Sequence, residues 1–149
     1  MATLGWDLVG TLRRLFEACR DGAGGYRTAA GHARDAGLRF LFQAHAEQRA
    51  RFATDLQGEL RRLGVRDRKT GAITAALRRG WAGVKAAVTA GSDRALVAEC
   101  VRAEGAAKRL FTEALRHDLP EDVRALVRWQ CEAVHEAHDR IRLSEMAAW

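Results

Sequence analysis

The sequence predicts an all-α protein, and three observations carry this prediction. The 149-residue chain contains a single proline, Pro120, and only 7% aromatic residues, which disfavours β-sandwiches and barrels. Its long runs of Ala, Leu, Arg and Glu are typical of helices. Apolar residues also recur at intervals of three and four along four long segments, as one face of a helix requires. We therefore expect one all-α domain over residues 1–149, large enough to bury a core without disulfides or metal.

The first predicted helix covers about residues 4–34, along a stripe that includes Leu12, Leu15 and Tyr26. Its second half contains several glycines, and each lowers helix propensity by roughly 1 kcal/mol relative to alanine. Two alternatives follow for this half. Either a neighbouring element packs very closely against it, or the helix is bent or frayed there.

The second predicted helix follows a short turn at residues 35–37 and ends at Gly64, with His45 and Arg49 on its inward stripe. Residues 64–71 form a loop, and the shorter amphipathic segment 72–89 forms a connecting helix. We expect Trp81 to pack this connecting helix against the bundle.

Ser92 is well placed as the N-cap of the third long helix, whose inward stripe contains Glu104. Pro120 suits the first turn of the fourth long helix, because the missing N–H is not needed there. The order is two helices joined tightly, a connection of nearly thirty residues, and two more helices joined tightly. This order predicts a ferritin-like four-helix bundle, whose long crossover from the second to the third long helix contains a short helix.

The composition restricts the classes of function. The formal charge is +6, but basic residues are mixed with acids along every helix and no stacking platform accompanies them. This pattern favours a solvated basic surface over a nucleic-acid partner.

No segment has the length and apolarity of a membrane span or the organisation of a signal peptide, and the three scattered cysteines form no C-x-x-C motif. We expect a cytoplasmic protein with reduced cysteines.

Di-metal bundles use inward glutamates and Glu-x-x-His motifs, and this sequence lacks most of that set. The one such motif, Glu132 to His135, is predicted to face water. Glu47 lies opposite the inward stripe of the second helix, and Glu17 and Asp21 lie outside the stripe of the first. A conventional di-metal site is therefore not expected.

The polar residues predicted to point inward allow two interpretations. The first is a hydrogen-bonded polar layer without any cofactor, made of Tyr26, Arg49, Glu104, Gln130 and His138. The second is a single iron, manganese or zinc ion held by His45, Glu104 and His138.

Helix counting places Arg49 and Glu104 at nearly the same depth in the bundle. Because a buried carboxylate must be paired, we predict a buried ion pair between them. Gln130 and Tyr26 are the expected additional hydrogen-bond partners, with His138 nearby.

Several short motifs also resemble a bacterial family of uncharacterised ferritin-like four-helix-bundle proteins. In chain order they are Cys19-Arg-Asp-Gly22, Gly25-Tyr26, Ala29-Ala30, Leu41-Phe42, Gln48-Arg49, Phe52, Arg79-Gly-Trp81, Glu99-Cys100, Glu104, Asp118-Leu-Pro120 and Ala137-His-Asp-Arg-Ile141. The chain departs from the family in having Ala and Gly before Gly25, where acids are common. The resemblance implies a fold and no settled activity.

Two functions remain open at this stage. One is a non-enzymatic bundle with a degenerate metal site and a structural, stress-related or protein-interaction role. The other is a metal-binding bundle with oxidoreductase or storage activity through His45, Glu104 and His138. A homodimer or another protein partner is expected in the first case, and exposure of Trp129 or Trp149 would indicate such a face.

Overall fold

The structure is a computed structural model that describes the backbone of residues 7–65 and 73–147, and the side chains of residues 7–65 and 81–146. Over these residues the chain is all-α, as predicted, and contains no strand. The helices are α1 (Leu8–His32), α2 (Ala36–Arg62), α3 (Ile73–Ala90), α4 (Asp93–Ala114) and α5 (Glu121–Ala147). The predicted start of the first helix at residue 4, most of the predicted loop and Trp149 lie outside the described residues.

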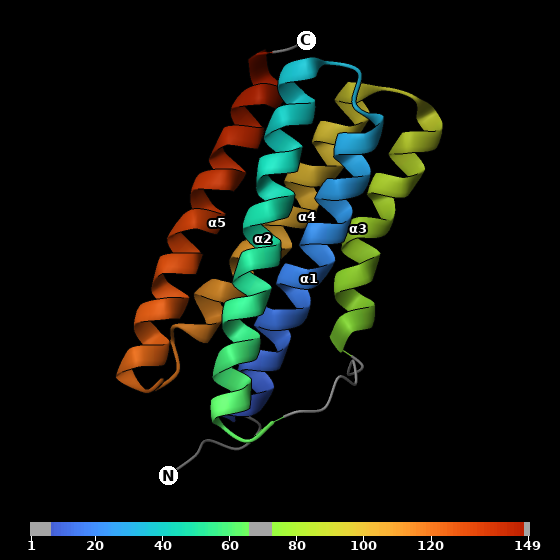
Figure 1. Cartoon of the computed structure of the whole chain (residues 1–149). Coiled ribbons are helices and arrows are strands. Elements are labelled where there is room, and N and C mark those ends of the chain that lie inside the picture. Colours follow the sequence, from blue (N-terminus) through green and yellow to red (C-terminus); the bar gives the residue numbers. More distant parts are fainter. Residues whose placement is uncertain (1–6, 66–72, 148–149) are drawn as a thin grey trace.

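The helices form a bundle of two antiparallel hairpins, α1 with α2 and α4 with α5 (Figure 1). Helix α3 brings the chain back along the bundle, so that α4 runs in the same direction as α2 (Figure 1). It packs on the outside against α1 and α4. Helices α1 and α2 make the most extensive contact, whereas α2 and α5 approach each other closely at only a few positions.

Side-chain caps hold the end of the bundle where α2 begins. Asp35 caps α2 by accepting the N–H of Leu38 at 2.9 Å, and Ser92 caps α4, as predicted, by accepting the N–H of Ala95 at 3.3 Å. Asp93 accepts the backbone N–H groups of Arg34 and Asp35 at 2.8 and 2.9 Å. These two bonds tie the α1–α2 turn to the start of α4.

Arginine side chains hold the opposite end. Arg124 donates to the backbone carbonyls of Leu115, at 3.1 Å, and His117, which lie just after α4. Arg62 near the end of α2 pairs with Asp122 in the first turn of α5 at 3.1 Å. Arg124 gives the Leu115 carbonyl a donor and adds a second donor to the His117 carbonyl, which also accepts the N–H of Leu119 at 3.0 Å. These bonds tie the end of α4 to α5.

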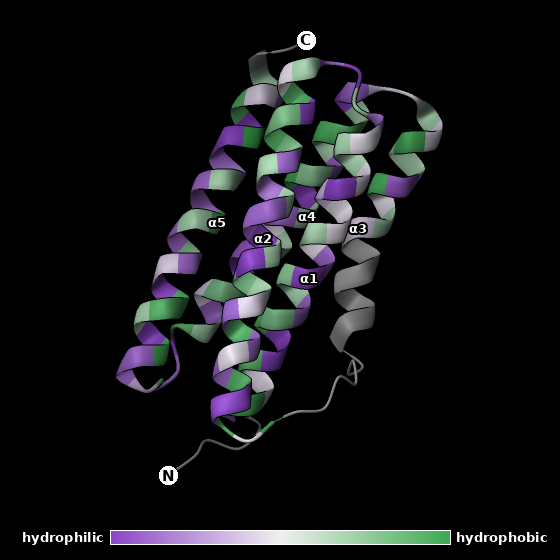
Figure 2. Cartoon of the chain, viewed as in Figure 1, coloured by the Kyte–Doolittle hydropathy of each residue, from purple (hydrophilic) through white to green (hydrophobic). Residues whose placement is uncertain are grey.

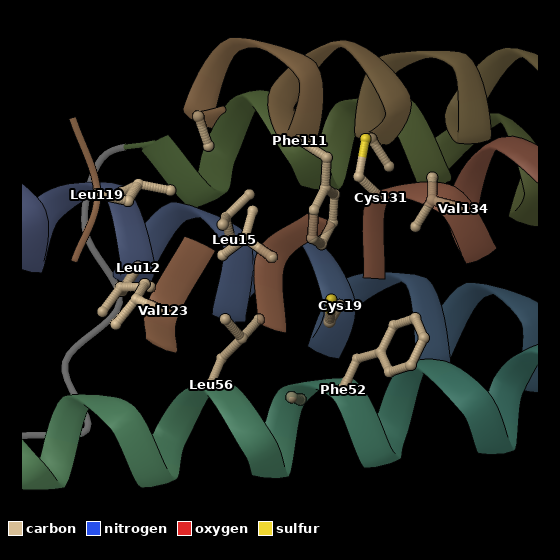
Figure 3. Close-up of a cluster of buried hydrophobic side chains, with 14 of the residues drawn as sticks. Leu12, Leu15, Cys19, Phe52, Leu56, Phe111, Leu119, Val123, Cys131 and Val134 are labelled. Atoms are coloured by element: carbon tan, nitrogen blue, oxygen red, sulfur yellow. The ribbon is translucent and has the colours of Figure 1, made fainter. Parts of the chain in front are cut away.

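Hydrophilic and hydrophobic residues alternate along each helix, as amphipathic helices require (Figure 2). The buried apolar side chains form two separate clusters. We call the first the Leu/Phe core (Figure 3); its largest members are Leu12, Leu15, Phe52, Leu56, Leu60, Phe111, Leu119, Val123, Val127 and Val134. We call the second the Ala/aromatic core; it contains Tyr26, Ala29, Ala33, Leu38, Phe42, Ala46, Trp81, Val84, Ala87, Leu96, Val97, Cys100, Ala103 and Ile141. Arg49 on α2 and Glu104 on α4 lie along their helices between members of the two clusters.

The glycine-rich half of α1 is a continuous helix with a close neighbour. A Cβ atom at Gly25 would overlap the Trp81 ring of α3, and one at Gly22 would lie 3.6 Å from Cγ of Arg49. Trp81 is buried, and its ring centroid lies 4.9 Å from that of Tyr26. Close packing, and not bending or fraying, therefore explains glycine at position 25, whereas a Cβ at Gly22 would make only an ordinary contact. Trp81 packs α3 against the bundle as predicted.

Candidate functional site: a buried polar layer

Arg49 of α2 and Glu104 of α4 form an ion pair across the interior of the bundle. Nη1 of Arg49 donates to Oε2 of Glu104 at 2.7 Å, and Nη2 donates to Oε1. The two side chains are 1% and 0% exposed. This is a two-bond guanidinium–carboxylate contact, which is the strongest geometry available to such a pair. Both carboxylate oxygens are engaged, so Glu104 is not available as a base.

Tyr26 of α1 lies beside this pair. The centroid of its ring is 5.7 Å from Cζ of Arg49, within the range of a cation–π contact. The ring of His45, one turn before Arg49 on α2, meets Tyr26 edge to face at 5.2 Å. Gly22, one turn before Tyr26, faces the aliphatic part of Arg49, where a Cβ would make an ordinary contact at 3.6 Å. Glycine is required at position 25, where a Cβ would overlap Trp81.

Gln130 of α5 is fully buried in this region but does not bond to the ion pair, so that part of the prediction is wrong. Its Nε2 donates to the backbone carbonyl of Phe52 at 3.4 Å. A carbonyl in the middle of a helix can accept this second bond because it has two lone pairs. Gln130 therefore links α5 to α2 where the two helices are otherwise in sparse contact.

His138 is only half-buried and lines a different part of the surface. It faces a groove between α4 and α5, together with Gly105, Lys108 and Thr112. Burial and the nearby Lys108 lower the pKa of His138, while Glu104 acts in the opposite direction. The sequence placed it on the inward stripe, but its position on α5 directs it toward the α4 side of the core and not toward Arg49.

The pKa shifts follow from burial and from the ion pair. Burial opposes the charge of Arg49, but Glu104 outweighs that effect and raises the pKa of Arg49 above its usual value. Burial, followed by the negative charge of Glu104, raises the pKa of Tyr26 well above its usual value. Burial lowers the pKa of His45 to about 4, against opposition from Glu104. Near neutral pH the layer therefore contains a charged pair surrounded by a neutral tyrosine and a neutral histidine.

Four side-chain atoms of the layer are buried without a hydrogen-bond partner among the described residues. They are the hydroxyl of Tyr26, Nε2 of His45, Nε of Arg49 and Oε1 of Gln130. His45 also lines a small pocket of about 60 Å³ between α2 and α5, with Gln48, Ala133 and Ala137 on its wall. Leaving such groups unpaired costs free energy. The pocket beside His45, between α2 and α5, is large enough for water or for a rearranged side chain.

The histidines proposed as metal ligands do not converge with Glu104 on one point. Among the described residues, no three His, Cys, Asp or Glu side chains could hold a metal ion together. His45 and His138 lie on opposite sides of α5, in different pockets, and Arg49 occupies both oxygens of Glu104. The set His45, Glu104 and His138 is therefore not assembled in this structure.

Glu132 and Glu47 are exposed, as the sequence analysis expected, but Glu17 is not. Glu17 is buried and pairs with Arg20 at 3.0 Å. The sequence pattern assumed that α1 buries one face only, but α1 packs against α2, α3 and α4 on several sides. The burial of Glu17 was therefore not predicted. Its burial adds no acid to the polar layer, since its helical position lies away from that of Tyr26.

The three cysteines are buried and free. Burial raises the pKa of the Cys19 thiol to about 12, with Arg49 lowering and Glu104 raising it to smaller extents. Burial likewise raises the pKa values of Cys100 and Cys131 above their usual range. These thiols stay protonated at neutral pH and are poor nucleophiles.

The fold and this layer define the class of protein: an all-α bundle in which an arginine–glutamate pair occupies the middle of the interior. The chain belongs to the family described as "Domain of unknown function (DUF2383)", whose model matches residues 7–117. This match includes α1 to α4 and ends before α5. No curated protein and no solved structure matches the chain. No helix in the described part of the chain has the length and apolarity needed to cross a membrane.

Proposed function

We propose that this protein is a single-domain, cytoplasmic bundle of the ferritin-like kind that does not act as an enzyme and works through contacts with other proteins. The single observation that carries the proposal is the Arg49–Glu104 pair. A guanidinium bonded to both oxygens of Glu104 supplies the positive charge that a metal ion supplies in di-metal bundles. The parallel direction of α2 and α4 supports the ferritin-like topology (Figure 1).

The surroundings of the pair support a non-enzymatic role. Burial raises the pKa values of Tyr26 and of the Cys19 thiol, so neither is ionised near neutral pH. His45, the candidate base beside the pair, faces a pocket of only about 60 Å³. A catalytic centre needs a nucleophile or base next to a space that a substrate can enter, and the groups beside the pair do not combine the two.

The interaction role is supported by exposed apolar side chains. Phe40 of α2 and Trp129, Leu143 and Met146 of α5 are large apolar residues with more than half of their surface exposed. Their exposure is the kind of feature that marks a protein contact. A structural or stress-related role would use the same surface.

Elemental analysis of protein purified without a histidine tag tests the proposal. We expect iron, manganese and zinc well below one equivalent per chain. The variant Glu104→Gln is the matched control, because it keeps the shape of the side chain and removes its charge. Stoichiometric metal in the unmodified protein that is lost in this variant would overturn the proposal and return Glu104 to the role of a ligand.

A further inference from the structure

The outer side of α5 presents a symmetric pattern of side chains. We define the outer α5 face by Trp129, Glu132, Glu136, Arg140 and Leu143, all of which are exposed. Their spacings of three, four, four and three residues keep them on one side of the helix. The pattern is symmetric about Glu136: large apolar residues lie seven positions away on each side, and opposite charges lie four positions away.

We propose that the outer α5 face pairs with the same face of a second copy of this chain, with the two helices antiparallel about a two-fold axis at Glu136. In a two-fold contact, each position on one copy meets its mirror position on the other. Trp129 then meets Leu143 of the second copy, and Glu132 meets Arg140 of the second copy. Each contact occurs twice. The Trp129–Leu143 contacts lie about 10 Å from the axis, and the Glu132–Arg140 contacts about 6 Å from it.

The structure shows that the residues at both ends of this face are available. Trp129 is 55% exposed and Leu143 63% exposed. The Trp129 ring rests edge to face on Phe52 of the Leu/Phe core, with centroids 5.1 Å apart, so its orientation is already fixed. A rigid, half-exposed tryptophan is the kind of residue that contributes most to protein contacts.

The charges in the middle of the face also suit a second copy. Arg140 bonds to Glu136 at 2.8 Å, which offsets the repulsion that two Glu136 side chains would meet at the axis. Glu132 makes no ion pair with any described residue, so its carboxylate is available to Arg140 of the second copy. An unrelated partner would need matching apolar and basic groups, whereas a second copy supplies both by symmetry.

The inference deepens the interaction part of the proposed function by naming the partner, but it can fail alone. A metal-free monomer would overturn the dimer and leave the non-enzymatic proposal in place. A dimer with stoichiometric metal would overturn the non-enzymatic proposal and leave the dimer in place.

Sedimentation velocity of the untagged full chain over a concentration series tests the pairing. We expect a reversible dimer for the unmodified chain and a monomer for Leu143→Glu. Phe40→Glu is the matched control, because it introduces the same charge at an apolar residue of α2 that is 76% exposed. This control should remain dimeric, and circular dichroism of each variant reports whether its helices are retained. A monomeric unmodified chain, or a dimer that Phe40→Glu dissociates and Leu143→Glu does not, would overturn the proposal.

Charge reversal tests the antiparallel register without changing any apolar contact. Glu132→Arg and Arg140→Glu should each raise the dimer dissociation constant about tenfold, which corresponds to about 1.4 kcal/mol. Combining the two substitutions restores opposite charges across the axis and should restore the affinity. A double variant as weak as the single variants would contradict this register.

Discussion

The two halves of the interior are built differently. The Leu/Phe core has large aliphatic and phenyl side chains from α1, α2, α4 and α5. The Ala/aromatic core has five alanines and three aromatic rings, and it is the half that the described part of α3 joins. Where a fifth helix packs against the bundle, small residues bring backbones together and a few rings fill the remaining space. In the half that the described part of α3 joins, small residues therefore accompany the close approach of the helices.

The polar layer lies where these two halves meet. Cys19 belongs to the Leu/Phe core and Tyr26 to the Ala/aromatic core, while Arg49 and Glu104 lie between them. The pair joins α2 to α4, two helices that make no close backbone contact. A two-bond ion pair between such helices can fix their relative height, which apolar packing alone leaves less well defined.

The largest expected effect comes from breaking this pair. Glu104→Ala should lower the free energy of unfolding by about 3 to 5 kcal/mol, because it leaves the Arg49 guanidinium buried and unpaired. Replacing both residues, Arg49→Met with Glu104→Leu, should cost little or even stabilise. Urea unfolding of the single and the double variant makes the comparison, and a near-zero effect of Glu104→Ala would show that the pair contributes nothing.

The next effect is a cavity in the Leu/Phe core. Leu56 is fully buried, and Leu56→Ala should cost about 2 to 5 kcal/mol, because the large neighbours cannot collapse into the space. Leu63→Ala is the control, since Leu63 lies half-exposed just beyond the last turn of α2. If both substitutions cost the same in urea unfolding, the Leu/Phe core is less tightly packed than described.

The Leu/Phe core is expected to lose stability when volume is removed, whereas the Ala/aromatic core should lose stability when volume is added. Gly25→Ala should destabilise by about 1 to 3 kcal/mol, because the new methyl group overlaps the Trp81 ring and forces α3 outward. Gly24→Ala is the matched control one residue earlier, where a Cβ meets nothing within 4 Å. It should stabilise by about 0.5 to 1 kcal/mol through helix propensity. A thermal unfolding midpoint that falls for Gly25→Ala and rises for Gly24→Ala would confirm the contrast. A rise for both variants would contradict the close approach of α3.

The sequence predicted the helices well because their signals are local. The stripes, the turn at residues 35–37 and Ser92 as a capping residue act within a few residues of one another. Pro120 was expected in the first turn of the last helix and lies immediately before α5, which begins at Glu121. The same periodicity gave the depths of Arg49 and Glu104, so their contact followed from counting turns.

The remaining errors concern how neighbouring helices are rotated about their axes. Gln130 was correctly placed inside, but which acceptor it reaches depends on the separation of α5 from α2. His138 was placed on the right helix but faces the α4 side. Glu17 is buried because α1 has neighbours on several sides, which a one-stripe pattern cannot represent. The signal that could have been used is Gly25, where a Cβ would overlap Trp81 and which therefore marks the close approach of α3 to α1.

The smallest of these effects is a pH dependence at the boundary between the two halves. The pKa of His45 is lowered to about 4 in the folded protein, mainly by burial, while the unfolded chain keeps the usual value of 6.5. As pH falls below that value, the unfolded chain binds a proton that the folded protein does not, so stability decreases until the pH approaches 4. Between about pH 7 and about pH 5 the loss from this residue should be roughly 2 kcal/mol.

Urea unfolding at the two pH values isolates this contribution. Because His45→Gln removes the titrating group, the variant should lose about 2 kcal/mol less than the unmodified chain between them. His32→Gln is the matched substitution outside the polar layer, since His32 is exposed at the end of α1. Glu104, Arg49, Arg140 and Glu136 are the charged groups that act on His45, and both substitutions leave them in place. An identical pH dependence in the unmodified chain and in His45→Gln would mean that the imidazole is solvated in the folded protein, and that the seam between α2 and α5 admits water as far as the polar layer.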